Sequence, residues 1–269
     1  MRFPANGMRK PVTLAKPIGL LLDDAVDEQM TIRLAGGGRR VLVHTLRGAK
    51  RRAPAKAIEY VATPADIAME CDCVLSMIED TTRLRQVLLG SQDRLGLGLE
   101  IAPGATLIDF GIRPPRECQA LMGTLGMRGL SLIDAAIVGT PQALANGTAT
   151  VLTGGFPDAV DAALPVLELI GRVERTGPLG SAHTAAALMG YMEAAHTIAL
   201  EEASRVGQAL GLNSDVLGRF FEAEPAPGNI ITFSRRADLA GRLAHERGLS
   251  AEVIDLTLRK LRQGPSENG

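Results

Sequence analysis

Three carboxylates, Asp23, Asp24 and Asp27, follow directly after the apolar run Ile18–Leu22 (IGLLL). A short apolar run bounded by polar residues predicts a buried strand. Acidic side chains where such a strand leads into a helix can bind a cationic group or transfer a proton. They can also cap the helix, because its dipole favours negative charge at the N-terminus. Together with Glu28 they could offer oxygen ligands to a metal ion, but the spacing matches no characteristic pattern, so we predict no metal site.

Three further residues could act with Asp24 in acid–base chemistry. His183 lies at the start of a predicted long helix, and an unperturbed histidine has a pKa of about 6.5, which suits proton transfer near neutral pH. Arg113 follows another predicted strand, and Tyr191 lies further along the long helix. A lone histidine among alanines is also often a packed, hydrogen-bonded side chain, and that interpretation stays open. The candidate catalytic set is therefore Asp24, His183, Arg113 and Tyr191.

Short β-rich runs alternate with helical segments through the first two thirds of the chain. This alternation predicts βαβ units and an α/β fold with a doubly wound parallel sheet. Ligands bind outside the carboxyl ends of the strands in such sheets, and Asp23, Asp24 and Arg113 follow strand ends. The predicted strands are 18–22, 40–45, 58–62, 73–78, 106–110, 131–138, 149–153 and 173–176.

The composition changes after position 180. Residues 182–210 lack proline and are rich in Ala, Leu, Met and Glu, which predicts one long helix. Ala182, Ala186, Gly190 and Ala194 place small side chains along one face of it, which favours close helix packing and a homodimer. Shorter helices are predicted at 213–222, 232–247 and 250–262. The predicted organisation is an N-terminal extension (1–16), an α/β domain (17–180) and a helical domain that includes the long helix (181–269).

Composition also bears on the partners. The 269 residues carry a net charge of −1, which provides no basic field for nucleic acid. No segment is apolar for long enough to span a membrane and no signal peptide is evident, so we expect a cytoplasmic protein without membrane contact.

The three cysteines, Cys71, Cys73 and Cys118, lack the spacing of a disulfide framework or a zinc site, and we expect buried thiols. The expected partner is a small molecule.

Several segments, in this order and spacing, carry a family resemblance. They are Thr63–Asp80 (TPADIAMECDCVLSMIED), Pro103–Phe110 (PGATLIDF), Asp134–Thr140 (DAAIVGT), Ala145–Thr148 (ANGT), Thr153–Gly155 (TGG) and Leu200–Leu212. The chain resembles the β-hydroxyacid dehydrogenase family, which includes 3-hydroxyisobutyrate dehydrogenases and is related to 6-phosphogluconate dehydrogenases and imine reductases. The resemblance implies a Rossmann-like domain, a long interdomain helix and a small all-α domain, shortened here. It also implies that a nicotinamide cofactor oxidises or reduces a small hydroxyacid, imine or semialdehyde.

The glycine motif of the family is altered in this sequence. Its G-x-G-x-x-G turn lets the backbone approach the pyrophosphate of the cofactor, and the three glycine positions fall on Leu22, Asp24 and Asp27. A carboxylate ~4 Å from one phosphate charge costs ~1 kcal/mol in water and ~4 kcal/mol at an effective dielectric near 20. We therefore expect pyrophosphate binding to be lost or weakened, and no cofactor is the leading expectation.

NADP is the expected cofactor if one binds. His44 and Thr45 stand where an NAD-preferring enzyme has an acidic residue for the ribose hydroxyls, and Arg47 follows them. Thr45, Arg47 and Met77 are the candidate cofactor-binding residues in that case. An exposed basic loop without a ligand is the alternative interpretation of Arg47.

The chemistry positions of the family differ as well. The resemblance places Ala186 at the catalytic lysine and Met189 at the asparagine that follows it. Val138 stands at the substrate serine, and Gly111 and Ile112 stand at a Ser-Thr pair. Because alanine donates no proton, we expect the hydride-transfer reaction of the family to be lost.

Three functions remain as hypotheses. The leading one is a cofactor-independent acid–base enzyme, of isomerase, cyclase or lyase type, acting on a small molecule. The first alternative is a noncatalytic pseudoenzyme or scaffold that kept the dimer. The second is an NADPH-dependent oxidoreductase of the β-hydroxyacid dehydrogenase or imine reductase type with an altered site.

Overall fold

The computed structural model describes residues 12, 15–23, 28–46, 55–91, 94–213 and 230–263. The chain divides into two units, residues 1–188 and 189–269. Helix α8 (Ser181–Ala209) is continuous and belongs in part to each unit. The predicted domain boundary, between 180 and 181, falls at the first residue of this helix.

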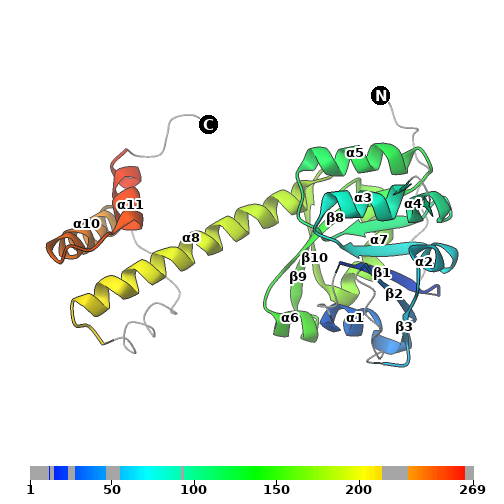
Figure 1. The fold of residues 1–269 in the computed structure, drawn as a ribbon, viewed down its shortest axis with the longest axis horizontal. Coiled ribbons are helices and arrows are strands. Elements are labelled where there is room, and N and C mark those ends of the chain that lie inside the picture. Colours follow the sequence, from blue (N-terminus) through cyan, green and yellow to red (C-terminus); the bar gives the residue numbers. More distant parts are fainter. Residues whose placement is uncertain are drawn as a thin grey trace. The chain divides into compact units, whose positions relative to one another are not determined.

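The first unit contains an eight-stranded sheet with helices on both faces, which confirms the predicted α/β, Rossmann-like fold (Figure 1). The predicted strands are all present, β1 and β8 with the predicted ends and the others with slightly different ones. They are β1 (Ile18–Leu22), β2 (Val41–Thr45), β3 (Ile58–Tyr60), β4 (Cys73–Met77), β7 (Thr106–Asp109), β8 (Ser131–Val138), β9 (Ala149–Gly154) and β10 (Gly171–Gly177). The helices are α1 (Glu28–Leu34), α2 (Pro64–Glu70), α3 (Thr81–Leu89), α4 (Leu97–Glu100), α5 (Pro115–Gly126), α6 (Pro141–Asn146) and α7 (Pro157–Ile170), with the short hairpin β5 (Gly90–Ser91) and β6 (Arg94–Leu95).

Six strands run parallel in the order β8-β7-β4-β1-β2-β3. Leu22 at the end of β1 is in register with Thr45 at the end of β2 and with Met77 at the end of β4. Asp109 at the end of β7 is in register with Ser76 of β4. We call the edge formed by the ends of β1, β2, β4 and β7 the carboxyl edge. It is where a parallel sheet of this kind binds ligands.

The prediction of a parallel sheet is confirmed for six strands and is wrong for the last two. β9 runs antiparallel to β8, and β10 runs parallel to β9. The physical reason is the length of the connections. Only the short helix α6 lies between β8 and β9, and a parallel crossover needs a dozen or more residues. The longer α7 between β9 and β10 provides such a crossover.

Buried side chains on both faces of the sheet explain why β1 reads as a continuous apolar run. Leu20 and Leu22 pack into the core cluster shared with α1 and α7, while Leu21 packs into the cluster shared with α2, α3 and α5. Gly19 allows α2 to approach, because a Cβ there would overlap the side chain of Ile67. The strand is therefore fixed by packing from both sides, and its carboxyl end has a defined position.

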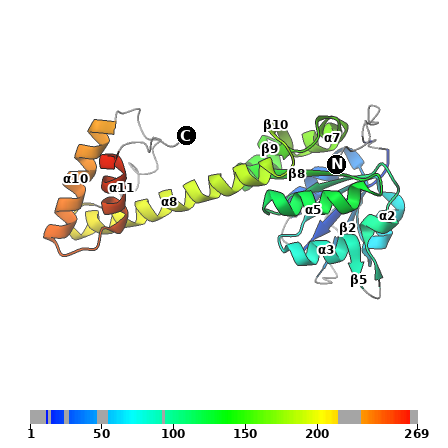
Figure 2. The same ribbon diagram turned by 90° about the horizontal axis from the view of Figure 1, so that it is seen from above.

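The described part of the second unit contains the later part of α8 with α10 (Ile230–Glu246) and α11 (Glu252–Gln263), and α10 and α11 lie side by side (Figure 2). Its core is small and centres on Val206, Ala244 and Ala251. The buried carboxylate of Glu202 accepts the backbone N–H groups of Val253 and Ile254 and so caps α11. The predicted helix 213–222 lies almost wholly outside the described residues. None of the described helices has the length and apolarity needed to cross a membrane.

Candidate functional site at the carboxyl edge

A buried ion pair between Asp109 and Arg113 lies at the end of β7, where both side chains are 1% exposed. Arg113 donates from Nε to Oδ2 at 2.5 Å and from Nη2 to Oδ1 at 2.9 Å, so the pair is bidentate. Arg113 also donates from Nη2 to the Ile78 carbonyl at 2.7 Å and from Nη1 to Thr81 Oγ1 at 2.9 Å. Thr81 in turn donates to Glu117 of α5 at 2.6 Å. Arg113 thus joins the ends of β4 and β7 to α3 and α5.

Two opposing effects act on the Asp109 carboxyl. Burial raises the pKa of Asp109 above its ordinary value, while the hydrogen bonds and charge of Arg113 and the N–H of Gly111 lower it. The Arg113 guanidinium is always charged, so the carboxylate is the group that balances a buried positive charge. Because the pair is satisfied within the protein, we infer that Arg113 acts in structure rather than on a substrate.

Gly111 makes room for this arginine. A Cβ at position 111 would overlap Nη2 of Arg113 and the carbonyl oxygen of Ile78. The guanidinium therefore occupies the space that a side chain at this position would need. The family resemblance places Gly111 at a position where the family has a serine. A serine side chain here would overlap the guanidinium of Arg113, so the buried arginine requires a glycine at this position.

Asp134 of β8 fixes the beginning of α8. Its fully buried carboxylate accepts the backbone N–H of Gly180 at 2.6 Å, of Ala182 at 2.8 Å and of His183 at 3.1 Å. A helix leaves its first N–H groups without intrahelical partners, and a carboxylate there satisfies them and matches the helix dipole. Gly154 of the neighbouring strand leaves the space for this carboxylate, which a Cβ would overlap.

His183 is fully buried, and both of its ring nitrogens have partners in the protein. Nε2 lies 2.9 Å from the carbonyl oxygen of Asp109, and Nδ1 lies 3.5 Å from Sγ of Cys118 in α5. Because a carbonyl only accepts hydrogen bonds, we assign the proton to Nε2, and Nδ1 then accepts the thiol hydrogen. Burial raises the pKa of Cys118 to about 12, so this thiol stays protonated at neutral pH. The ring links α8 to β7 and α5, which matches the packed interpretation of this histidine.

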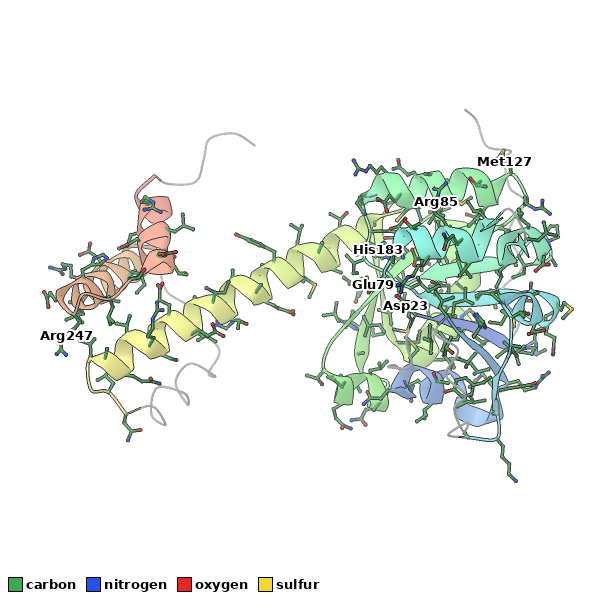
Figure 3. The ribbon with its side chains drawn as sticks, in the orientation of Figure 1. Asp23, Glu79, Arg85, Met127, His183 and Arg247 are labelled. Carbon is green, nitrogen blue, oxygen red and sulfur yellow. The ribbon has the colours of Figure 1, made fainter. Side chains whose placement is uncertain are left out.

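Asp23 is the one member of the acidic run that lies within the described residues. Its Oδ1 accepts a hydrogen bond from Nη1 of Arg83 in α3 at 2.7 Å. The Asp23 and Arg83 side chains are 22% and 47% exposed, so this ion pair faces solvent. Figure 3 shows Asp23, Glu79 and His183 at the same end of the first unit. Within the described part of the chain, no group of three His, Cys, Asp or Glu residues could hold a metal ion.

The other predicted site residues are dispersed. Thr45 is buried and Met77 is half-buried, and their backbones flank that of Leu22 in the sheet. Tyr191 is 72% exposed on α8 and belongs to the second unit. Asp24 and Arg47, with Asp27, lie outside the described residues. Of the predicted catalytic residues, the structure brings together Arg113 and His183, which share the partner Asp109.

Sequence reasoning missed three residues at this edge. Asp109 and Asp134 had a signal, because an acid inside an apolar strand, as in TLIDF and SLIDAAIV, must be paired when it is buried. Arg83 had none. It is one of two arginines in the sequence TTRLRQVLL of α3, and its partner Asp23 is 60 residues away.

A separate cavity of about 530 Å³ lies along β9 and β10, which form one edge of the sheet. Its walls are mainly apolar and come from α5, α7 and the segment before α8, including Met122, Phe156, Val160 and Leu179. Three strands separate β9 from β1. This cavity is therefore distinct from the carboxyl edge at β1.

The chain is similar to known proteins over most of its length. The family model for the NAD-binding domain of 6-phosphogluconate dehydrogenase matches residues 28–190. L-Threonate dehydrogenase of Cupriavidus necator is 30% identical over 58% of this chain and 52% of that protein. NAD-dependent L-serine dehydrogenase of Pseudomonas aeruginosa is 30% identical over 56% of this chain and 50% of that protein. The chain thus spans about half the length of these curated relatives.

Solved structures show the same fold. An imine reductase from Myxococcus stipitatus in complex with NADP⁺ gives a TM-score of 0.77 at 15% identity, covering 92% of this chain and 93% of that one. The 3-hydroxyisobutyrate dehydrogenase of Mycobacterium tuberculosis with L-serine gives a TM-score of 0.66 at 18% identity, with 92% and 93% covered. At these identities the likeness concerns the fold alone.

Proposed function

The chain belongs to the family of the NAD-binding domain of 6-phosphogluconate dehydrogenase, and on this basis we propose that it is an NAD(P)-dependent oxidoreductase of the β-hydroxyacid dehydrogenase or imine reductase type. The observation that carries the proposal is the family match over residues 28–190, which includes β2 to β10 and the start of α8. A bound nicotinamide would supply the hydride chemistry. The proposed substrate is a small hydroxyacid or the corresponding carbonyl compound, since relatives named for L-threonate and L-serine align with the chain.

The described residues at the carboxyl edge offer a dinucleotide one half-exposed cation, Arg83, among several carboxylates. Arg83 of α3 has a half-exposed guanidinium that reaches Asp23 at the end of β1, where an anion would need a cation. Thr45 and Met77 flank the same strand end. Asp23 is the opposing feature, since its carboxylate would repel a phosphate. Glu79 and Asp80, which follow β4, are exposed carboxylates as well, so the Arg83 guanidinium faces three acidic side chains and is available to a phosphate only when it leaves Asp23.

NADP is the proposed form of the cofactor. The end of β2 carries His44 and Thr45 in place of the acidic side chain that holds the ribose hydroxyls of NAD. Thr45 is buried, and Nδ1 of His44 lies 3.4 Å from the carbonyl oxygen of Val61. This end of β2 therefore presents no carboxylate that would repel a 2′-phosphate.

The comparisons favour this oxidoreductase over the cofactor-independent acid–base enzyme that the sequence analysis put first. His183 and Arg113 are buried and hydrogen-bonded within the protein, which argues against direct contact with a substrate. Loss of the glycine motif stays a prediction, because Asp24 and Asp27 lie outside the described residues. The proton that accompanies the hydride must come from a group other than residue 186, since Ala186 has none to give.

We also propose that the chain forms a homodimer through α8 and the helices of the second unit. Several large apolar side chains of α8 are more than half exposed, namely Leu188, Tyr191, Met192 and Ile198. A second copy that covers them would remove apolar surface from water. The oligomeric state in solution, measured by light scattering, tests this expectation.

Cofactor binding is the decisive experiment for the proposed function. The full chain is titrated with NADPH and with NADH, and binding is followed by calorimetry and by the melting temperature. A ligand present at ~100 times its Kd stabilises the folded state by ~2.7 kcal/mol, so we expect a clear rise in melting temperature with NADPH. Turnover is then tested with NADP⁺ and L-threonate, L-serine or 3-hydroxyisobutyrate by the absorbance of NADPH. Absence of any response to millimolar NADPH or NADH would contradict the proposal and leave the scaffold hypothesis and the cofactor-independent acid–base enzyme.

A further inference from the structure

The exposed ion pair at the end of β1 suggests how a dinucleotide could bind without the glycine motif of the family. We propose that Arg83 binds the pyrophosphate of the cofactor, and that Asp23 is a built-in competitor that holds the guanidinium until the cofactor displaces it. This inference rests on the proposed function, and it names a binding residue for that site.

The position of the pair supports a pyrophosphate ligand. Leu22 at the end of β1 is in register with Met77 at the end of β4, and Asp23 and Arg83 come from the segments that follow these two strands. The Asp23–Arg83 bond therefore crosses the space above two neighbouring strand ends, where parallel sheets bind ligands. The end of β2, next to which the ribose 2′ position is read, lies on the other side of β1. Arg83 is accordingly placed for the pyrophosphate rather than for the 2′-phosphate.

The geometry of Arg83 also suits an exchange of partners. Its bond to Asp23 comes from Nη1 alone, and the side chain is 47% exposed. A guanidinium has five N–H donors in a fork that matches two phosphate oxygens. Its backbone N–H is already bonded to Oδ1 of Asp80, the N-cap of α3, at 2.8 Å, so the side chain is what this residue can offer to a ligand. A pyrophosphate carries two negative charges against the single charge of Asp23, which favours the exchange, while the carboxylate of Asp80 beside Arg83 opposes it.

Arg113 provides the contrast within the same edge. It donates to Asp109, Ile78 and Thr81, and its side chain is 1% exposed. Exchange of that arginine to a ligand would leave a buried carboxylate without its partner, which is strongly unfavourable. Of these two arginines, Arg83 is the one that can change partners at low cost.

Calorimetric titration of the full-length chain with NADH and with NADPH tests the inference. The variants are Arg83→Met, Asp23→Asn and the control Arg85→Met, which removes the same charge from an exposed position on the same helix (Figure 3). We expect R83M to weaken binding of both nucleotides by about tenfold, the effect of losing one charge-assisted hydrogen bond. We expect D23N to tighten binding of both by about fivefold, the effect of removing one like-charge contact at ~4 Å in water. R85M should bind both as the unmodified chain does.

The possible outcomes separate this inference from the proposed function. If the unmodified chain binds neither nucleotide, the proposed function fails, unless D23N binds them, which would support the competitor role of Asp23. If the unmodified chain binds NADPH and R83M binds it equally well, only the assignment of Arg83 is overturned. A loss in R83M that affects NADPH but not NADH would move Arg83 to the 2′-phosphate and contradict the pyrophosphate assignment. Weaker binding in D23N would contradict the competitor role. Melting temperatures of the variants without nucleotide confirm that each is folded.

Discussion

Two Asp–Arg pairs at the same edge of the sheet differ in almost every physical respect. Asp109 and Arg113 are four residues apart, buried and bidentate, and they share their bonds with β4, α3 and α5. Asp23 and Arg83 are 60 residues apart, partly exposed and joined by one bond. The first pair is surrounded by protein, and the second faces water.

The difference indicates which of the two pairs belongs to structure and which can serve a ligand. Two buried charges are each costly to take out of water, so the Asp109–Arg113 pair can persist only with both partners present. An exposed pair gains little from its bond, because water solvates both charges when they separate. The buried pair therefore acts as a fixed support for the ends of β4 and β7, whereas separation of the exposed pair costs little, as the proposed exchange requires.

The strongest test of this distinction is Arg113→Met. Removal of the guanidinium leaves the Asp109 carboxylate buried and unpaired, and we expect the free energy of unfolding to fall by about 3–5 kcal/mol. Urea unfolding followed by circular dichroism measures the change. Arg116→Met is the matched control, because Arg116 is exposed on α5 and its removal should change the stability by less than about 0.5 kcal/mol.

A double variant separates pairing from packing. In Asp109→Leu with Arg113→Met, no charge is left unpaired, so we expect much of the lost stability to return. If R113M alone were as stable as the unmodified chain, the buried pair would have no structural role and the comparison of the two pairs would fail.

The second test concerns the space that Gly111 leaves for the arginine. Gly111→Ser restores the residue type of the family at this position, but its side chain would overlap Arg113 and the Ile78 carbonyl. We expect a loss of about 1–3 kcal/mol from overpacking. In the double variant with R113M the combined loss should be smaller than the sum of the two single losses, because one of the overlaps is gone. Additive losses would show that the glycine and the arginine are independent.

The fold could be predicted from the sequence because its determinants are local. Apolar runs such as Ile18–Leu22, and the proline-free stretch that became α8, carry their own signals of strand and helix. The reversal of β9 was missed, although the short connection after β8 was visible in the sequence. The glycine at position 111 was visible too, but only the packed structure shows Arg113 in the space beside it.

The site was predicted less well because it depends on contacts between distant residues. His183 was correctly placed at the start of a helix, but its partners Asp109 and Cys118 come from other elements of the first unit. The pairing of Asp23 with Arg83 follows from the order of the strands, which places α3 next to the end of β1. Strand order is a property of the assembled sheet and has no signal in any one segment. The sequence therefore indicated the acidic run but not Arg83, the arginine that pairs with Asp23.

The smallest effect on stability is expected for a change in the exposed pair. Asp23→Asn keeps the shape of the side chain and removes its charge, so the bond to Arg83 weakens while the rest of the first unit is unchanged. For a pair exposed to this degree we expect the free energy of unfolding to change by less than about 1 kcal/mol. A double-mutant cycle with Arg83→Met measures the coupling of the two side chains directly, and we expect it to stay below the same limit. A coupling of several kcal/mol would mean that the pair is held as rigidly as the buried one, and Arg83 could not then exchange its partner for a phosphate.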